Sequence, residues 1–276
     1  MKYKLIAVDL DGTLLNDKKL ICDYNMDRIN KALNMGVKFV LCSGRLPSAL
    51  RAYSEMTAKG QPVICSNGAI LLDGDGGIIY KSCIDKNRVL EMIDIFREEK
   101  DDTYYHFYDE NTIYTEQFTM SAKNLYEFSR KLDRKLRIEI RVMPDLKSIA
   151  KEKDIDINKI VVIDEDLNYL SRLREKLKNV QDIEITSSEI TNIEIMNKGV
   201  SKGSGVNLLA RYYNIPIDEC ITIGNDENDI SMIESEAFGV AVSNAKDPVK
   251  QCADYVTSKD NNEGAIGEVI DKFILN

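Results

Sequence analysis

The hydrophobic residues of the chain gather in short apolar runs that alternate with amphipathic segments. Each run is too short for a helix, which favours a buried parallel strand. These runs are Leu5–Val8, Val37–Cys42, Pro62–Ser66, Cys220–Ile223 and Phe238–Val242. Between the first two, apolar residues recur at helical spacing over residues 24–35 and the pattern ends near Gly36. Strands that alternate with helices predict an α/β fold with a parallel sheet.

The pattern changes in the middle of the chain, from about residue 84. Helical spacing over residues 89–96 precedes a strand-like alternation at Tyr104–Tyr108. Strand pairs alternate with helices here, so we expect an α+β module over 84–191, inserted into a core of residues 1–83 and 192–276. Its other predicted elements are helices over about 121–136 and 167–178, and strands at 113–114, 138–142 and 159–163 and around Ile183 and Ile193.

Two carboxylates follow the first apolar run directly. Asp9 and Asp11 stand at the carboxyl end of the predicted strand, where open α/β sheets bind ligands, and Gly12 and Thr13 turn the chain. One carboxylate can attack phosphorus, a second can exchange protons with the leaving oxygen and water, and a divalent cation can neutralise both. An Asp-Gly turn alone is the simpler interpretation. The full Asp-x-Asp-Gly-Thr pattern after a buried strand favours the catalytic one.

Further polar residues follow other predicted strands. Ser43 with Gly44 can bind an anion at the start of a helix, or Ser43 can simply cap that helix. Arg45 can face substrate or solvent. Lys202 opens a later helix, where lysine is normally exposed, but here it would supply the positive charge that Asp9 and Asp11 require.

A second polar cluster, Gly224-Asn-Asp-Glu-Asn-Asp229, follows the run at Cys220–Ile223. Asp226, Glu227 and Asp229 could include metal ligands, since Mg²⁺ prefers oxygen donors. The alternative is a loop that caps the following helix.

Composition excludes several classes of protein. The net charge of the 276 residues is -9, which argues against nucleic acid as a partner and requires any phosphate site to be locally positive. Charged residues in the first twenty positions and the lack of a long apolar run indicate neither signal peptide nor membrane anchor, so we expect a cytoplasmic protein. The six scattered cysteines are expected to be buried free thiols, and the single histidine, His106, has no motif for a catalytic triad.

Three other polar or aromatic segments favour structural interpretations. Asp73-Gly-Asp-Gly-Gly77 lacks the downstream glutamate of a calcium loop and predicts a hairpin turn. Tyr104–Tyr108 is expected to pack, although one of its faces could line a substrate pocket. A basic cluster in the module predicts a solvated face more than an anion-recruiting patch. Its members are Arg130, Lys131, Arg134, Lys135, Arg137 and Arg141.

Taken in order, four motifs resemble those of the haloacid dehalogenase (HAD) superfamily of phosphohydrolases. They are Asp9-Leu-Asp11-Gly-Thr, Ser43-Gly-Arg, Lys202-Gly and Gly224-Asn-Asp-Glu-Asn-Asp229. The length, the large insert and Asn67-Gly-Ala69 are similar to the Cof subfamily with a type IIB cap. The resemblance covers the whole chain and implies a Rossmann-like HAD core, with the inserted module as a mobile cap that excludes water and selects substrate.

The resemblance also implies roles for individual residues. Asp9 would be the nucleophile and Asp11 the general acid and base. Asp9, the Asp11 backbone carbonyl and Asn225 would hold Mg²⁺, and Asp229 would orient Lys202 or metal-bound water. The phosphate would be bound by Ser43, Gly44, Lys202, Asn228 and the backbone of Leu10.

Asn225 departs from the family pattern, which usually has aspartate at this position. Its amide oxygen can still ligate Mg²⁺, but one negative charge is lost. We expect weaker Mg²⁺ affinity than in an Asn225→Asp variant, and Asp226 could instead serve as the ligand.

The sequence thus predicts a cytoplasmic, Mg²⁺-dependent phosphatase for small phosphorylated metabolites such as sugar phosphates, acting as a monomer or homodimer without nucleic acid or membrane partners. Dehalogenase activity is disfavoured, because it has no need of Asp11 as acid and base. Two alternatives are a sugar phosphomutase, which returns the phosphoryl group to substrate, and a catalytically weak protein that binds phosphorylated ligands for regulation.

Overall fold

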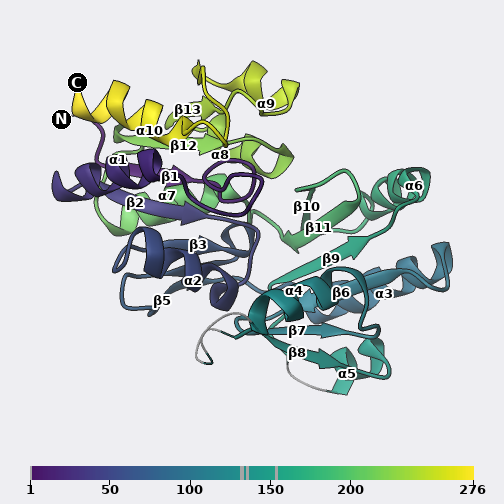
Figure 1. Ribbon diagram of the computed structural model, residues 1–276. Helices are drawn as coiled ribbons and strands as arrows, with labels where there is room; N and C mark the ends of the chain where they lie inside the picture. Colours follow the sequence, from purple (N-terminus) through teal and green to yellow (C-terminus); the bar gives the residue numbers. More distant parts are fainter. Residues whose placement is uncertain (1, 131–133, 135–136, 153–154) are drawn as a thin grey trace. The chain divides into compact units, whose positions relative to one another are not determined.

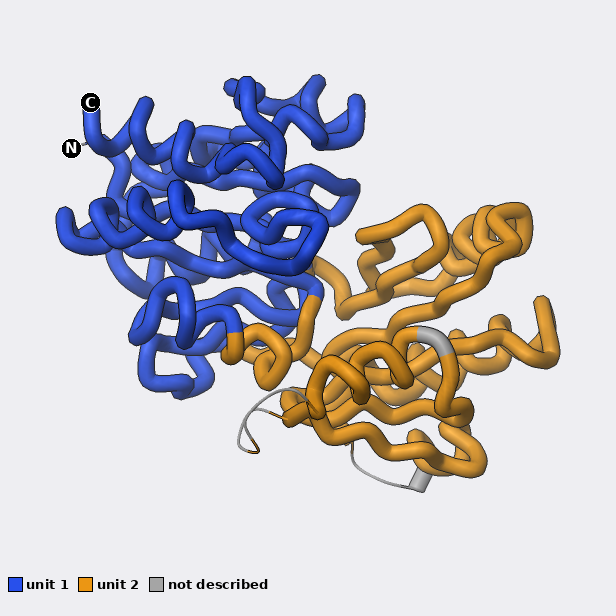
Figure 2. The backbone as a smooth tube through the Cα atoms, in the orientation of Figure 1, with its two compact units in different colours: residues 1–44, 53–80, 201–276 blue, residues 45–52, 81–200 orange. Residues whose placement is uncertain are grey.

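The computed structural model describes residues 2–130, 134, 137–152 and 155–276, which fall into two compact units (Figure 2). The first unit comprises residues 1–44, 53–80 and 201–276, and the second comprises residues 45–52 and 81–200. The second unit therefore lies within the sequence of the first.

The first unit is built on an eight-stranded sheet (Figure 1), ordered β14-β13-β12-β1-β2-β3-β4-β5. β1 pairs in parallel with β2 on one side and β12 on the other, and β4 is antiparallel to β3. All five predicted apolar runs contain a strand, and the predicted α/β class with a parallel sheet is confirmed. The strands are β1 Leu5–Val8, β2 Lys38–Cys42, β3 Val63–Cys65, β4 Ile70–Leu72, β5 Ile78–Lys81, β12 Cys220–Gly224, β13 Phe238–Ala241 and β14 Tyr255–Val256.

Helices connect these strands. α1 and α10 pack closely, since the Gly267 N–H donates to Asn25 Oδ1 over 2.8 Å and a Cβ on Gly267 would lie 2.4 Å from the Tyr24 ring. In the described ranges, no helix is long and apolar enough to cross a membrane. The helices are α1 Asp23–Asn34, α2 Pro47–Thr57, α7 Lys202–Tyr212, α8 Ile230–Ile233, α9 Asp247–Cys252 and α10 Ala265–Ile270.

The second unit contains a six-stranded sheet, ordered β10-β11-β9-β6-β7-β8. Its pairs are antiparallel except for β7 with β8. The strands are β6 Tyr104–Tyr108, β7 Thr112–Thr115, β8 Glu139–Val142, β9 Lys159–Ile163, β10 Ile183–Thr186 and β11 Asn192–Asn197. The helices are α3 Lys86–Glu99, α4 Met120–Arg130, α5 Leu146–Glu152 and α6 Leu167–Leu177.

Successive residues of β6 enter two different hydrophobic clusters. Tyr105 and Phe107 pack with Phe96 of α3 in the larger one, whereas Tyr108 packs with Leu46 in the smaller one. Every residue of β6 is buried, so the predicted packing role of this aromatic strand agrees with its surroundings.

The bounds of the second unit differ from the predicted insert, 84–191. β11 pairs with β9 and β10, which brings residues 192–197 into the sheet of this unit. Residues 45–52, which include the start of α2, also group here because Leu46 and Ala49 pack against Tyr108. Neither feature has a local sequence signal, since both depend on contacts between distant segments.

His106 and the cysteines take structural positions. His106 is fully buried on β6, and burial, followed by the charge of Lys159, lowers its pKa to about 3, so the imidazole is neutral. Its Nδ1 lies 3.4 Å from Ser121 Oγ. All six cysteines are free thiols, as predicted; Cys42, Cys65 and Cys220 are buried and the other three partly buried.

The basic cluster of the insert is exposed where the structure describes it. Arg130, Arg134, Arg137 and Arg141 all have exposed side chains, which agrees with a solvated face. The remaining members, Lys131 and Lys135, lie outside the described residues, as does much of the predicted helix beyond Arg130.

Candidate active site

Strand order brings the first motif and the fourth motif to one edge of the first sheet. β1 lies between β2 and β12 and runs parallel to both, with Val8 in register with Leu41 and Ile223. Parallel strands end at a common edge, so the residues that follow them gather there. Asp9 follows β1 directly, and its N–H donates to the Ile223 carbonyl over 2.9 Å.

A buried lysine joins two buried aspartates at this edge. Lys202 Nζ donates to Asp9 Oδ1 and to Asp229 Oδ1, each over 2.6 Å. The side chains of Lys202 and Asp229 are 0% exposed and that of Asp9 is 9% exposed. Lys202 opens α7, where the Ser201 hydroxyl caps the helix and accepts from the Ser204 N–H. The lysine that would normally be solvated is therefore an internal cation here.

The charges of this group determine its protonation. Burial, and then repulsion from Asp229, raises the pKa of Asp9 from 3.8 to about 7, although Lys202 opposes the rise. Burial disfavours the charged form of Lys202, but Asp229 and Asp9 outweigh it and raise the pKa of the ammonium above its usual value. A cation thus faces a carboxylate that burial has made unusually basic.

The Asn225 carboxamide faces the other oxygen of Asp9. One end of the amide lies 3.2 Å from Asp9 Oδ2, 3.1 Å from the Asp11 carbonyl oxygen and 2.8 Å from Thr13 Oγ1. With its NH₂ there, the amide donates to all three oxygens. With its oxygen there, it accepts from the Thr13 hydroxyl and meets two further oxygens, a set that a cation would satisfy.

This donor set fits Mg²⁺, which takes hard oxygen ligands. It offers one carboxylate (Asp9), one backbone carbonyl (Asp11) and one amide oxygen (Asn225). Among the described residues, no group of three or more His, Cys, Asp or Glu side chains could hold a metal. The set at Asp9 is of a different kind, because only one of its three donors is a carboxylate.

The other acids of the two motifs point to different partners. The Asp11 carboxylate accepts from Lys19 Nζ over 2.8 Å. Asp226 Oδ1 accepts from Lys246 Nζ over 2.7 Å and from the Glu227 N–H over 2.6 Å, so it caps the short turn Glu227–Asp229. Asn225, and not Asp226, therefore faces Asp9.

Asp229 fixes the loop that carries Asn225. Its Oδ2 accepts from the N–H groups of Asn225 over 2.8 Å and Asp226 over 3.0 Å, while its Oδ1 binds Lys202. Gly224 is needed just before the loop, since a Cβ there would lie 2.4 Å from Asp229 Cγ. One buried carboxylate thus positions both the lysine and the amide.

The predicted phosphate ligands are placed by their strands. Ser43 is buried after β2 and its N–H donates to the Ile64 carbonyl over 2.9 Å, with Gly44 next in the chain. Leu10 follows Asp9 and is fully buried. Asn228 is buried as well, and its Nδ2 donates to Asn67 Oδ1 over 3.3 Å.

Two residues of this edge were not among the predicted site residues. Thr13 contacts Asn225, and Asn67 contacts Asn228. Thr13 stands in the first motif itself, and Asn67 follows the third apolar run, so position relative to the strands could have pointed to both.

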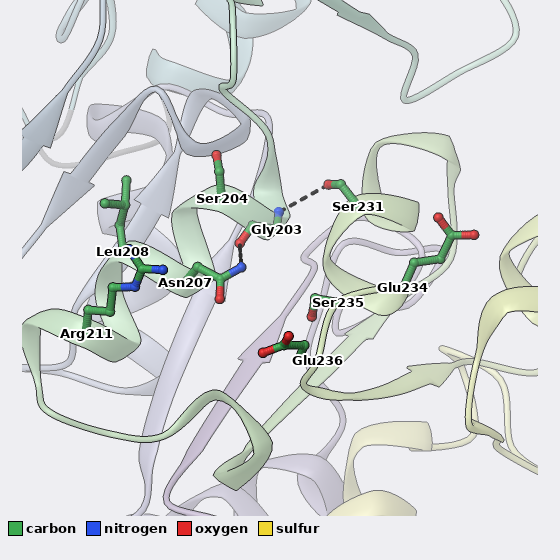
Figure 3. Close-up of a pocket in the computed structure, with 9 residues that line it drawn as sticks. All are labelled: Gly203, Ser204, Asn207, Leu208, Arg211, Ser231, Glu234, Ser235 and Glu236. Carbon is green, nitrogen blue, oxygen red and sulfur yellow. Dashed lines mark hydrogen bonds between the residues drawn. The ribbon is translucent and has the colours of Figure 1, made fainter.

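The packing of α7 against α8 holds Lys202 in place. The Gly203 N–H donates to Ser231 Oγ over 3.1 Å, and the Gly203 carbonyl accepts from Asn207 Nδ2 over 3.1 Å (Figure 3). A cavity of about 700 Å³ lies beside this contact and includes none of the predicted site residues. Its lining consists of Gly203, Ser204, Asn207, Leu208, Arg211, Ser231, Glu234, Ser235 and Glu236.

We expect Gly203→Ala to impair both stability and activity. A Cβ on Gly203 would lie 2.1 Å from the Ser231 carbonyl oxygen, so α7 must move and carry Lys202 with it. Overpacking of this kind costs roughly 1–3 kcal/mol of unfolding free energy. Urea unfolding and an assay of the predicted phosphatase activity measure the two effects. Asn207→Ala, which removes only a hydrogen bond in the same helix, is the control. Wild-type stability in Gly203→Ala would contradict the prediction.

Comparisons with known proteins agree with this arrangement. A family model described as haloacid dehalogenase-like hydrolase matches residues 6–270. The chain is 28% identical over 278 residues to the phosphatase YwpJ of Bacillus subtilis (strain 168), covering 95% of this chain and 96% of that protein. It is 28% identical over 272 residues to the 5-amino-6-(5-phospho-D-ribitylamino)uracil phosphatase YcsE of the same organism, covering 99% and 96%. The structure of the HAD subclass IIB sugar phosphatase BT4131 superposes with a TM-score of 0.82 over 98% of each chain at 24% identity, a likeness of fold.

Proposed function

Because the chain belongs to the haloacid dehalogenase-like hydrolase family, we propose that it is a Mg²⁺-dependent phosphatase that hydrolyses small phosphorylated metabolites through an aspartyl-phosphate. The observation that carries the proposal is the buried Asp9–Lys202–Asp229 group, with both Lys202 contacts at 2.6 Å. Burying these charges is costly, so a site that keeps two carboxylates around one ammonium favours a catalytic role over a structural one.

In the first step of the proposed reaction, one carboxylate oxygen of Asp9 attacks phosphorus. The bond from phosphorus to the leaving oxygen breaks, and Asp11, which enters this step in its protonated form, gives that oxygen its proton. In the second step, Asp11 takes a proton from water, whose oxygen attacks phosphorus and displaces the Asp9 carboxylate. Inorganic phosphate and the free alcohol are the products, and both aspartates return to their starting forms.

The remaining predicted residues would bind the phosphoryl group. Lys202 supplies positive charge beside Asp9, and Asp229 holds that ammonium in place. The Ser43 hydroxyl, the backbone N–H groups of Leu10 and Gly44, and the Asn228 amide are the proposed donors to the phosphoryl oxygens. Mg²⁺, held by Asp9, the Asp11 carbonyl and Asn225, would neutralise phosphoryl charge when bound.

We assign substrate selection to the second unit, as a cap. Its core is separate from that of the first unit, and it contains a buried ion pair between Lys159 Nζ and Glu194 Oε1 at 2.8 Å. A small substrate is supported by the relatives, since YcsE is named for a phosphorylated ribitylaminouracil and BT4131 for sugar phosphates. A monomer or homodimer in the cytoplasm, acting without nucleic acid or membrane, is the proposed setting.

Phosphate release from a panel of substrates tests the proposal. The panel contains sugar phosphates, nucleotides, FMN and pyridoxal phosphate, each with Mg²⁺ and with EDTA. The proposal predicts metal-dependent release from at least one sugar phosphate or similar small ester. An isomerised sugar phosphate without free phosphate would favour a mutase, and binding without turnover would favour a regulatory protein.

A further inference from the structure

We propose that Asn225 makes the divalent cation and the phosphoryl group bind cooperatively, so that the cation binds strongly only when a phosphate oxyanion is present. This inference rests on the proposed function, because it concerns the same site. It assigns Asn225 a role in regulating metal occupancy beyond that of a ligand.

The first argument is that the Asn225 amide has two arrangements, of which only the one with NH₂ toward Asp9 satisfies both ends of the amide without a cation. With NH₂ toward Asp9, it donates to Asp9 Oδ2 at 3.2 Å and to the Asp11 carbonyl at 3.1 Å. With oxygen in that place, it could ligate a cation together with the same two oxygens. Thr13 Oγ1, 2.8 Å away, can accept from the NH₂ or donate to the oxygen, and so it supports both arrangements.

The second argument is that the NH₂ arrangement competes with the cation. The donated hydrogens occupy the space among the three oxygens, and they satisfy Asp9 Oδ2 without a metal. A cation must therefore break these hydrogen bonds before it binds. An aspartate at position 225 could not donate these hydrogen bonds. Its carboxylate would repel that of Asp9, and without a metal nothing would compensate this repulsion.

The third argument is the charge of the site. When Asp9 is ionised, as a metal ligand must be, Asp9 and Asp229 carry two negative charges against one positive charge on Lys202. When Asp11 is ionised, its charge is offset by Lys19, and that of Asp226 is offset by Lys246. One net negative charge therefore attracts a divalent cation weakly, and the loaded site has one net positive charge that attracts a phosphate dianion. An aspartate at position 225 would make the loaded site neutral and weaken this coupling.

The test is calorimetric titration of Mg²⁺ into wild-type protein and Asn225→Asp, each with and without saturating inorganic phosphate. We expect phosphate to raise the Mg²⁺ affinity of the wild type at least about tenfold. Without phosphate, Asn225→Asp is expected to bind Mg²⁺ at least about tenfold more tightly than the wild type. Phosphate should then raise the Mg²⁺ affinity of the variant by a smaller factor than that of the wild type.

Asn16→Asp is the matched control, because it adds the same charge in the loop that carries Lys19. Asn16 Oδ1 accepts from the N–H groups of Lys18 and Leu20, and a carboxylate can do the same. Its Mg²⁺ affinity and coupling should match those of the wild type. The reciprocal measurement needs no variant. Mg²⁺ must raise the phosphate affinity of the wild type by the same factor by which phosphate raises its Mg²⁺ affinity.

Two results would overturn the inference alone and leave the proposed function standing. One is wild-type Mg²⁺ affinity equal to or above that of Asn225→Asp without phosphate. The other is Mg²⁺ binding that phosphate does not change in the wild type. Absence of Mg²⁺ binding in both proteins would overturn the inference together with the metal requirement of the proposed phosphatase.

Discussion

Replacing Asp9 by asparagine is expected to abolish phosphate release, with a loss in kcat of roughly 10⁴-fold or more. The amide is nearly isosteric with the carboxylate, but it cannot form the acyl-phosphate on which the proposed reaction depends. Release of phosphate from the most active substrate of the panel, at saturating substrate and Mg²⁺, measures the effect. Residual turnover within tenfold of the wild type would exclude Asp9 as the nucleophile.

The same variant should be more stable than the wild type in the absence of metal. A carboxyl whose pKa is raised to about 7 binds its proton more tightly in the folded protein than in the unfolded chain. Wild-type stability therefore falls as pH rises from about 4 to about 7 and stays reduced above that range. Asparagine at this position does not titrate and causes no such loss. In EDTA, the Tm of Asp9→Asn should therefore exceed that of the wild type by an amount that grows over this pH interval. A difference in Tm between Asp9→Asn and the wild type that shrinks with rising pH would contradict the raised pKa of Asp9. The pH dependence also distinguishes this charge effect from misfolding of the variant.

Replacing Lys202 by methionine is expected to have the second large effect. Methionine fills most of the space but leaves Asp9 and Asp229 buried without their shared cation. Removing one partner of a buried ion pair costs about 3–5 kcal/mol of unfolding free energy. We also expect kcat to fall by roughly 10³-fold, because the phosphoryl group loses a positive charge in a site shielded from water.

Urea unfolding and phosphate release, measured on folded protein, check both parts. Lys198→Met is the control, since Lys198 pairs with Asp182 on the surface and its side chain is 70% exposed. Such a surface pair contributes about 0–1 kcal/mol, so the control should differ little from the wild type. A folded Lys202→Met protein with wild-type turnover would show that the ammonium has no part in the reaction.

The sheet of the first unit could be predicted because its strands are short, apolar and bounded by polar turns. Leu5–Val8 is both the predicted run and the observed β1, and the residues after it form the candidate site. Parallel strands that are buried on both faces require this pattern, so hydrophobicity alone identifies them. The same pattern placed Asp9 and the Gly224–Asp229 loop each directly after a predicted strand.

Local patterns could not decide the environment of individual polar residues. A lysine at a helix start is normally solvated, yet Lys202 is fully buried, and Asp9 and Asp229 come to it from other segments of the chain. The choice between Asn225 and Asp226 was equally open. It depends on the capping turn, which points Asp226 toward Lys246 and leaves Asn225 beside Asp9.

The second unit was harder to predict because its elements depend on each other. β11 contains Glu194, whose buried carboxylate pairs with Lys159 of β9 and accepts from the Ser188 hydroxyl. α5, Leu146–Glu152, was not predicted, although Asp145 accepts from the Lys147 N–H as a helix cap would. Short helices of this kind have too few turns to give a periodic hydrophobic signal. A capping residue alone does not identify such a helix in the sequence.

The most direct test of the proposed mechanism is to trap the covalent intermediate. Wild-type protein is mixed with a ³²P-labelled substrate of the panel and Mg²⁺, quenched in acid within milliseconds, and reduced with borohydride, which converts an acyl-phosphate to an alcohol. The account predicts acid-stable label on the protein and homoserine at position 9, both absent from Asp9→Asn. Rapid phosphate release with no label at any time, and no homoserine at position 9, would contradict it.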